Sequence, residues 1–330
     1  MKVLYIGGTG EISHSCLFAS HAAGHQCAVY NRGRSEQPIP PTARQITGDV
    51  NDPAAYGQLA REHFDVVCQF TAYTLADIER DLKVFGGHTG QYVFISTASA
   101  YEKPPTRYRI TEDVPLRNPY WPYSQTKADM EARLMKAHEA RQLPVTIVRP
   151  SHTFRRRFPG TFVSGDVHAW RMLNGRPVIS HGDGNSLWTL THSEDFAVPF
   201  VKLLGRGEAL GEAFHITSDC VYTWDQIFRT MAAVLEAPLS IVHVPTDTLV
   251  RYRKEWTGPL LGDKAWCTTF DHSKLTALTG PLPVPRPLEE RFAQVVPHYR
   301  ERARNTAPDR ELHALLDRIA EEQSRLGAQS

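Results

Sequence analysis

The chain has 330 residues, of which 41% are hydrophobic and 22% charged, and its formal net charge is +1. This is ordinary globular composition, and the near-neutral charge gives no electrostatic argument for a nucleic-acid or membrane partner. The five cysteines are scattered without a CxxC pair, which argues against disulfides and a thiolate metal site. No histidine pair has metal-ligand spacing, and no long apolar stretch is present. We therefore expect a cytoplasmic protein without a bound metal.

The first half of the chain alternates between apolar, β-branched runs and stretches with helical periodicity. Strands are predicted at residues 2–7, 25–32, 64–72, 91–99 and 144–151, and helices at 14–24, 52–63, 75–87 and 123–142. Such alternation with short connections predicts an α/β fold with a Rossmann-like, doubly wound parallel sheet.

The second half has a different composition. After about residue 150 the alternation weakens, and prolines and aromatic residues increase. We expect a dinucleotide-binding domain at 1–150, with about 188–217 returning to its sheet. A smaller substrate-binding cap and C-terminal helices would comprise 151–187 and 218–330. Residues 308–326 are expected to form an exposed amphipathic helix.

The first predicted strand runs into GGTGEIS, a glycine turn that opens a helix. Gly7 permits the tight turn and Gly10 lets the backbone approach a pyrophosphate, whereas the third small position holds Ser13 instead of glycine. The amide of Glu11 would face the phosphate, while its side chain would point to solvent or a ribose hydroxyl. A purely structural turn is the alternative, but a glycine loop between a strand and a helix favours a cofactor site that includes Ile12.

The second predicted strand ends where an acidic residue usually binds the adenosine ribose. Here Asn31 takes that place, followed by Arg32 and Arg34, which would pair with a 2′-phosphate. This favours NADP, with NAD as the other option, unless the arginines form a solvated loop. Asp49, next to Val50, would accept a hydrogen bond from the adenine amino group. The end of the third strand should also contact the cofactor, through Phe70, Thr71 and Ala72.

Tyr123 and Lys127 lie four residues apart in a helical pattern, so they share one face. A tyrosine is a poor base near neutral pH, because its reference pKa is about 10. A nearby ammonium lowers that pKa, so that the phenol can exchange a proton with a carbinol or carbonyl oxygen. Thr97 or Ser96, at the end of the fourth strand, would donate to the same oxygen. The alternative is an exposed Tyr–Lys pair without function.

With these pieces the chain resembles the extended short-chain dehydrogenases/reductases, which include nucleotide-sugar epimerases and dehydratases. The matching segments, over residues 1 to about 220, are GGTGEIS, GDV, FISTASAYEKP, TEDVPL, YSQTK, RPS, HGDGNSLWTLTHSEDFA and EAFHITS. The resemblance implies an NAD(P)-binding domain, a small cap and a catalytic triad of Thr97, Tyr123 and Lys127. It also implies that Pro150 and Ser151 line the nicotinamide, and that two helices pair into a homodimer.

Two departures from the family bear on the reaction and the substrate. In the sugar 4,6-dehydratases an Asp–Glu pair follows the strand-end hydroxyl, whereas this chain has Ala98 and Ser99. Dehydration is therefore not expected, and Ser99 is a candidate substrate contact. An arginine that often clamps the substrate diphosphate is replaced by Trp188, which would stack on a sugar or base.

Two other features are candidates for substrate binding. Arg155, Arg156 and Arg157 follow one another at the expected mouth of the cap, where they would bind an anionic substrate or form a solvated loop. His152 follows the strand expected to line the nicotinamide, so it would touch substrate.

The sequence therefore predicts an enzyme that transfers hydride at a hydroxyl or keto carbon of a sugar or nucleotide-sugar-like molecule. It would act as an epimerase or as an oxidoreductase. One alternative is a simple ketoreductase for a non-nucleotide substrate. Others are an RNA-binding member of the fold, disfavoured by the near-neutral charge and the triad, and a redox-sensing regulator, which would usually lack the tyrosine or lysine.

Overall fold

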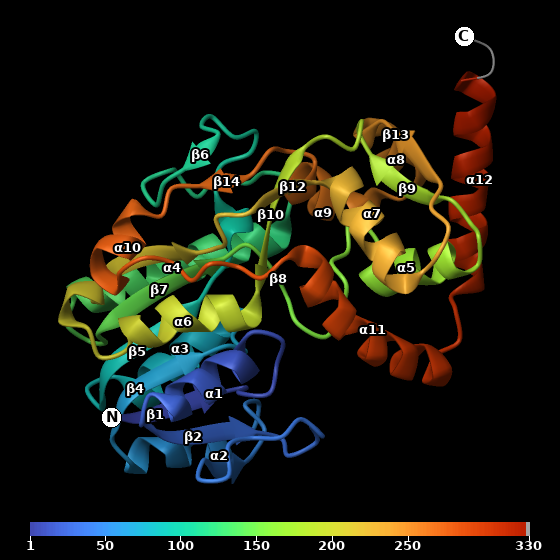
Figure 1. The fold of residues 1–330 in the computed structure, drawn as a ribbon. Helices are drawn as coiled ribbons and strands as arrows, with labels where there is room; N and C mark the ends of the chain where they lie inside the picture. Colours follow the sequence, from blue (N-terminus) through green and yellow to red (C-terminus); the bar gives the residue numbers. More distant parts are fainter. Residues whose placement is uncertain (328–330) are drawn as a thin grey trace.

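Seven parallel strands form the central sheet of the larger of two lobes (Figure 1). The computed structural model describes residues 1–327. Across the sheet, the strands are β11 (Glu212–Ile216), β7 (Val145–Pro150), β5 (Thr89–Ile95), β4 (Phe64–Gln69), β1 (Lys2–Ile6), β2 (Gln26–Asn31) and β3 (Arg44–Thr47). The strand order reverses direction between β1 and β4, where a doubly wound sheet binds its ligand. The predicted fold class is confirmed.

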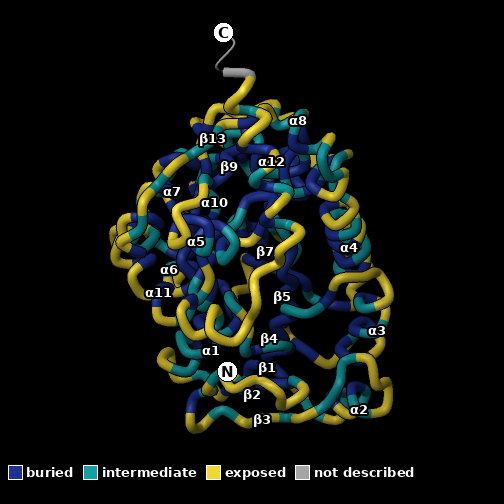
Figure 2. Tube along the Cα trace, turned by 90° about the vertical axis from the view of Figure 1, so that its right-hand side faces the viewer, coloured by how far each residue is buried: buried dark blue, intermediate teal, exposed yellow. Residues whose placement is uncertain are grey.

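Helices cover both faces of this sheet. One face is covered by α1 (Ser13–Ala22), α6 (Ser193–Leu203) and α10 (Ser273–Thr279), and the other by α2 (Pro53–Gly57), α3 (Leu75–Phe85) and α4 (Pro122–Glu139). Within β1, Val3 and Tyr5 belong to the hydrophobic core under α1 and α6, whereas Leu4 and Ile6 belong to the core under α3 and α4 on the opposite face. Successive strand residues point to opposite faces, so a strand buried on both sides must be apolar throughout. Figure 2 shows β1, β4, β5 and β7 as buried tube inside the molecule.

The smaller lobe is the cap. It contains a three-stranded sheet of β12 (Val221–Thr223), β10 (Leu187–His192) and β8 (His152–Phe154), and a parallel pair of β9 (Val178–His181) and β13 (Ile241–Val244). Its helices are α5 (Gly165–Leu173), α7 (Trp224–Leu235), α8 (Thr246–Tyr252), α9 (Thr257–Pro259), α11 (Leu288–Asn305) and α12 (Arg310–Gly327). A short pair, β6 (Arg109–Ile110) and β14 (Thr269–Phe270), bridges sequence-distant loops. None of the helices in residues 1–327 is long and apolar enough to cross a membrane.

Two expectations about the second half of the chain need correction. Within 188–217, β11 joins the central sheet beside β7, but β10 lies in the cap, where Leu190 pairs with His152 of β8. The reason is that β8 follows almost directly after β7 and provides a parallel partner outside the main sheet. The helix α12 is also less exposed than predicted, because Leu316 and Ile319 are buried against β9 and β13.

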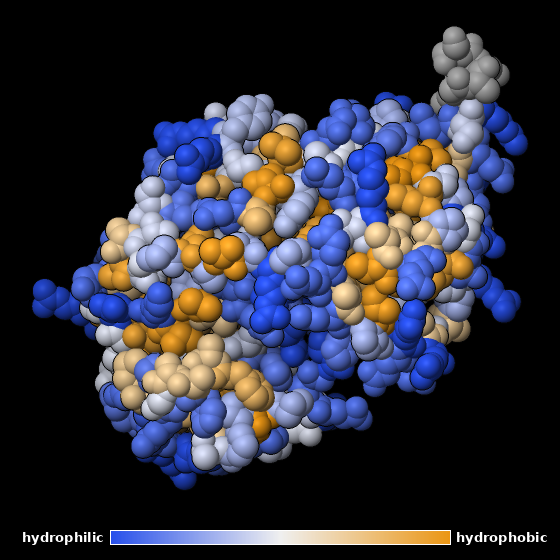
Figure 3. All heavy atoms as spheres, in the orientation of Figure 1, coloured by the Kyte–Doolittle hydropathy of each residue, from blue (hydrophilic) through white to orange (hydrophobic). Residues whose placement is uncertain are grey.

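The surface contains scattered hydrophobic residues. On the face shown in Figure 3, they form separate small areas among hydrophilic side chains. A scatter of this kind is normal for a protein in water. This face therefore provides no argument for a dimer, and the homodimer remains a prediction.

A buried ion pair joins α4 to β7. The Arg149 guanidinium donates to the Glu131 carboxylate, with Nη2 2.7 Å from Oε2 and Nε 3.1 Å from both oxygens. Arg149 also donates to the Tyr101 hydroxyl and to the Glu112 carbonyl, each at 3.1 Å. Both charged side chains are buried, at 7% and 4% exposure. The pair thus connects the helix that bears Tyr123 and Lys127 to the sheet.

We predict that Glu131→Gln lowers the free energy of unfolding by about 3–5 kcal/mol, because it leaves the buried Arg149 charge without its carboxylate. Urea denaturation followed by circular dichroism measures the change. The matched control is Glu79→Gln, which breaks the more exposed Glu79–Arg133 pair between α3 and α4; its expected cost is about 0–1 kcal/mol. Equal effects of the two substitutions would contradict the prediction.

Candidate active site

Two adjoining cavities form a trough over the carboxyl ends of the central strands. One, of about 360 Å³, extends from the glycine loop to Tyr123 and Lys127, and the other, of about 430 Å³, extends to the end of β2. Four residues line both cavities: Gly7, Gly10, Thr71 and Tyr73. The trough lies where the strand order reverses, which is the expected position of a dinucleotide in this fold.

The glycine loop is closed by Ser13, which replaces the third glycine of the pattern. Its Oγ accepts a hydrogen bond from the Gly10 amide at 2.9 Å and donates to the Gly7 carbonyl at 2.8 Å. Gly7 has a φ of +90°, and a Cβ there would lie 2.3 Å from Thr71 Cγ2. Only glycine fits at position 7. The serine therefore stabilises the loop through its hydroxyl.

Glu11 points in a direction that the sequence did not predict. Its Oε2 accepts from the backbone N–H of Arg156 at 3.0 Å, so the carboxylate is bonded to the cap, while the residue remains partly exposed and lines the first cavity. The first turn of α1 has no side-chain cap at Ile12. Amides at the start of a helix attract anions. The glycine cradle and these amides fit a pyrophosphate, which the Glu11 and Ile12 backbone would hold.

The adenosine half of the trough contains the residues expected there. Asn31, Arg32, Arg34, Asp49 and Val50 all line the second cavity. Asn31 Oδ1 accepts from the Gly33 amide at 2.8 Å, and Asp49 Oδ1 accepts from the Asn51 amide at 2.9 Å. In each contact a side-chain oxygen accepts from the backbone amide two residues later and so stabilises the loop. Arg32 and Arg34 are exposed at the rim of the cavity.

The end of β4 contributes differently from residue to residue. Phe70 and Thr71 line the first cavity, as do Pro150 at the end of β7 and Ser151 directly after it. Ala72 is only 1% exposed, and its carbonyl accepts from Lys127 Nζ at 2.9 Å. The predicted contact between Ala72 and the cofactor is therefore corrected to an indirect role, through Lys127.

The three triad residues lie together. Tyr123 occupies the first turn of α4 and Lys127 the next turn, while Thr97 follows β5. Thr97 and Tyr123 both line the first cavity, and Thr97 Oγ1 lies 3.0 Å from Ser99 Oγ, which lies 2.7 Å from Ser124 Oγ. Thr97 is thus a strand-end hydroxyl in the same cavity as the tyrosine.

The Lys127 ammonium is buried between two strands. Nζ donates to the carbonyls of Ala72 and Ile95, each at 2.9 Å, and the side chain is 3% exposed. Burial lowers the pKa of Lys127 to about 8. Burial, with smaller effects from Tyr73 and Asp263, raises the pKa of Tyr123 to about 12. The expected lowering of the tyrosine pKa by Lys127 is not seen, because the ammonium is directed at the two carbonyls.

A third cavity, of about 220 Å³, lies on the other side of Tyr123 and also touches Thr97, Ser99 and His152. Among the lining residues that the sequence did not predict are Trp121, Asp263 and Lys264. Lys264 Nζ is 3.0 Å from Asp263 Oδ2, and it lies 5.7 Å from the centre of the Trp121 ring. Both charged residues end a π-helical turn, Leu260–Lys264, in a segment without a motif. No sequence signal connects this turn to Tyr123.

The prediction for Trp188 is wrong. Its indole is 1% exposed and packs on Trp224, so it cannot stack on a substrate. Instead, its Nε1 donates to His152 Nδ1 at 3.0 Å. Burial lowers the pKa of His152 to about 3, which keeps its ring neutral and able to accept this bond. Trp188 therefore orients His152 at the wall of the third cavity.

The three consecutive arginines do not form one basic patch. Arg155 donates to His14 and Gln37 beside α1, and Arg156 donates to His298 of α11. Arg157 donates to Asp166 at 3.4 Å and also lines a further cavity of about 250 Å³, which touches His152. Each of the three arginines thus bonds to a different part of the protein, and the expectation that they face one anionic substrate together is wrong.

A Rossmann sheet with this glycine loop and triad defines an extended short-chain dehydrogenase/reductase. The model of the NAD dependent epimerase/dehydratase family matches residues 3–217, and the chain belongs to this family. The family and its relatives place the chain among NAD(P)-dependent oxidoreductases and epimerases.

Relatives of known name are distant. The chain is 25% identical over 288 residues to 2'-dehydrokanamycin reductase of Streptomyces kanamyceticus, covering 84% of this chain and 79% of the relative. It is 25% identical over 256 residues to the chloroplast stem-loop binding protein of 41 kDa b of Arabidopsis thaliana, covering 70% and 62%. Among solved structures, an epimerase of Methanothermobacter thermautotrophicus superposes with a TM-score of 0.75 at 17% identity, covering 92% of this chain and 93% of that one. UDP-glucose 4-epimerase of Thermus thermophilus, in complex with NAD, has a TM-score of 0.69 at 21% identity, covering 91% and 99%. The structures support the fold.

The buried Lys127 makes a prediction about pH. The folded chain releases this proton near pH 8, whereas the unfolded chain holds it to an ordinary pKa of 10.5. Stability from this group is therefore present at high pH and lost as the pH falls through about 8. Between about pH 7 and pH 10, the wild type should gain roughly 2–3 kcal/mol of unfolding free energy relative to Lys127→Met.

Urea denaturation at several pH values measures this difference in unfolding free energy. The test is how the difference changes with pH, because its absolute size also includes the packing change made by the substitution. The control is Lys136→Met on the exposed side of the same helix, which should follow the wild type at every pH. Parallel curves for the wild type and Lys127→Met would show that Lys127 titrates normally.

Proposed function

We propose that this chain is an NADP-dependent oxidoreductase that transfers hydride at a carbonyl or carbinol carbon of a sugar-like molecule. One observation carries the proposal: Thr97 and Tyr123 line both the cofactor trough and the third cavity. A carbonyl in the third cavity would thus meet a proton donor at the point where the two cavities join. That is the geometry required for combined hydride and proton transfer.

The residues divide the proposed chemistry among them. Tyr123 Oη gives a proton to the developing alkoxide in reduction, or takes it from the carbinol in oxidation, while Thr97 donates a hydrogen bond to the same oxygen. When bound, the nicotinamide supplies or accepts the hydride, and its oxidised ring brings a positive charge that favours the phenolate. Lys127 holds the ends of β4 and β5 and can donate to the nicotinamide ribose.

The substrate proposal favours a sugar-like molecule without a nucleoside diphosphate. Trp188 stands where a diphosphate-binding arginine would be expected and is buried, and Arg155 and Arg156 are engaged elsewhere. The similarity to 2'-dehydrokanamycin reductase supports reduction of a ketone. We do not propose dehydration, because Ala98 and Ser99 carry no carboxyl group after Thr97.

The cofactor preference is the first test. We predict that NADPH binds about 10- to 100-fold more tightly than NADH, because a charge-assisted arginine–phosphate bond contributes roughly 1.5–3 kcal/mol. Arg32→Ser with Arg34→Ser should remove this preference and leave NADH affinity unchanged. Fluorescence titration with both cofactors measures it, with the exposed Arg61→Ser as control. Equal affinities in the wild type would mean that the rim arginines do not contact the cofactor.

The role of Tyr123 is the second test. The wild type is incubated with NADPH and a panel of free keto-sugars and nucleotide-linked keto-sugars, and loss of NADPH absorbance is followed. Tyr123→Phe should lower turnover by roughly 10²–10⁴-fold, because the proton donor is lost, while NADPH affinity changes little. The control Tyr108→Phe alters a tyrosine that is 72% exposed and lines neither the cofactor trough nor the third cavity. Turnover of Tyr123→Phe within a few-fold of the wild type would rule out the assignment.

A further inference from the structure

We propose that Asp81, a buried carboxylate of α3, is a positioning residue for the cofactor trough. It would act by holding residues 70–74, the loop after β4 from which Thr71 and Tyr73 line both halves of the trough. This inference rests on the proposed binding of a dinucleotide there. It assigns a role to side chains that touch neither the cofactor site nor the substrate cavity.

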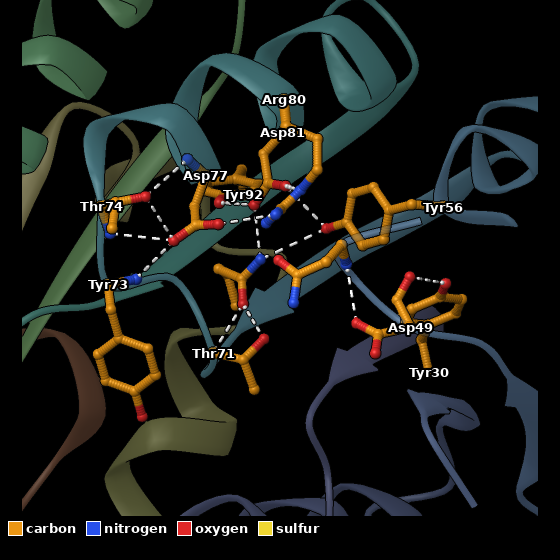
Figure 4. Close-up of polar contacts among 12 residues, drawn as sticks. Tyr30, Asp49, Tyr56, Thr71, Tyr73, Thr74, Asp77, Arg80, Asp81 and Tyr92 are labelled. Atoms are coloured by element: carbon orange, nitrogen blue, oxygen red, sulfur yellow. Dashed lines mark hydrogen bonds and ion pairs between the residues drawn. The ribbon is translucent and has the colours of Figure 1, made fainter. Parts of the chain in front are cut away.

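Asp81 is surrounded by donors from its own helix and from three other elements (Figure 4). Its carboxylate accepts from the Tyr92 hydroxyl of β5 at 2.6 Å and from the Tyr56 hydroxyl of α2 at 2.8 Å. It also accepts from Gln69 Nε2 at 2.5 Å and from Arg80 Nε at 3.2 Å. Asp81 is fully buried, and burial raises its pKa. The cluster fixes one carboxylate by four donors.

The first connection to the trough runs through Gln69, the last residue of β4. A carboxylate cannot donate, so the Gln69 amide must turn its NH₂ toward Asp81 and its oxygen the other way. That oxygen, Oε1, accepts from the Thr71 amide at 2.7 Å and from the Thr71 hydroxyl at 3.0 Å. Thr71 in turn packs on Gly7, where there is no room for a Cβ. Asp81 thereby orients the residue that supports the glycine loop.

The second connection runs through Arg80 and Asp77. Arg80 Nη1 donates to Asp77 Oδ1 at 2.7 Å, and Asp77 Oδ2 accepts from the amides of Tyr73 and Thr74 at 3.0 and 2.9 Å. In Figure 4, Thr71 and Tyr73 lie below Asp77 and Asp81. The backbone of the loop is thus held on both sides of Ala72.

Ala72 lies between the two held residues, and its carbonyl accepts from Lys127. The Tyr73 ring also lies 5.1 Å from Lys127 Nζ. The loop that Asp81 holds therefore contributes both to the trough and to the seat of the lysine. An apolar side chain at position 81 would fill the core at a lower desolvation cost, but it would leave the Gln69 amide free to flip.

Three variants in the same cluster test the proposal. Asp81→Asn keeps the side-chain volume but introduces a donor opposite Gln69, and Gln69→Met removes the bonds to Thr71. Both should weaken NADPH binding by about tenfold or more. Tyr92→Phe removes a donor to Asp81 that lies outside both connections, and it should leave NADPH affinity within about twofold. Fluorescence titration gives the affinities, and circular dichroism gives the melting temperatures.

NADPH affinities are compared between variants whose melting temperatures fall by similar amounts. A loss of affinity in Asp81→Asn and Gln69→Met but not in Tyr92→Phe indicates positioning and not a general loss of stability. If Asp81→Asn fails to fold, Asp77→Ala at the partly exposed start of α3 replaces it, with a several-fold loss of NADPH affinity expected. The proposal would be overturned if all variants bound NADPH within twofold of the wild type, or if Tyr92→Phe lost as much affinity as the other variants. In either case, NADPH binding by the wild type would leave the proposed function intact. A wild-type chain that binds neither NADPH nor NADH would overturn both.

Discussion

The close contact between Gly7 and Thr71 is the constraint on which the rest of the site depends. A Cβ at position 7 would collide with Thr71, so the glycine loop and the end of β4 can approach only without a side chain there. Ser13 closes the loop from the α1 side through two hydrogen bonds. Gln69 holds Thr71 from the opposite side. The shape of the trough is therefore formed by contacts within the protein, which lowers the entropic cost of binding a dinucleotide.

Burial determines the charges beside this trough. Lys127 is buried where it donates to two carbonyls, so its pKa is lowered, and partial desolvation of Tyr123 raises the pKa of that phenol. Each shift disfavours the charged form of the side chain. Without a bound cofactor, neither shift favours a Tyr123 phenolate beside a Lys127 ammonium. A positively charged nicotinamide ring beside Tyr123 would favour the phenolate.

The cap contacts the nucleotide-binding lobe at the site itself. β8 follows directly after β7 and brings His152 to the third cavity, while Glu11 of the glycine loop binds the Arg156 amide of the cap. The third cavity is completed by Asp263 and Lys264, from a turn far along the chain. A displacement of the cap would therefore change the glycine loop and the third cavity together.

The features that depend on local pattern could be predicted from the amino-acid sequence. Glycine spacing, apolar runs and the separation of Tyr123 from Lys127 follow from backbone conformation and helical period, so the sheet and the candidate triad were predicted. Tertiary structure decided whatever depends on contacts between distant residues. The polar edge strand β3 exists through its pairing with β2, Trp188 is buried by Trp224, and Asp263 reaches Tyr123 only through the folding of the cap. No local pattern encodes these contacts, because the direction of a side chain and its burial are properties of the packed chain.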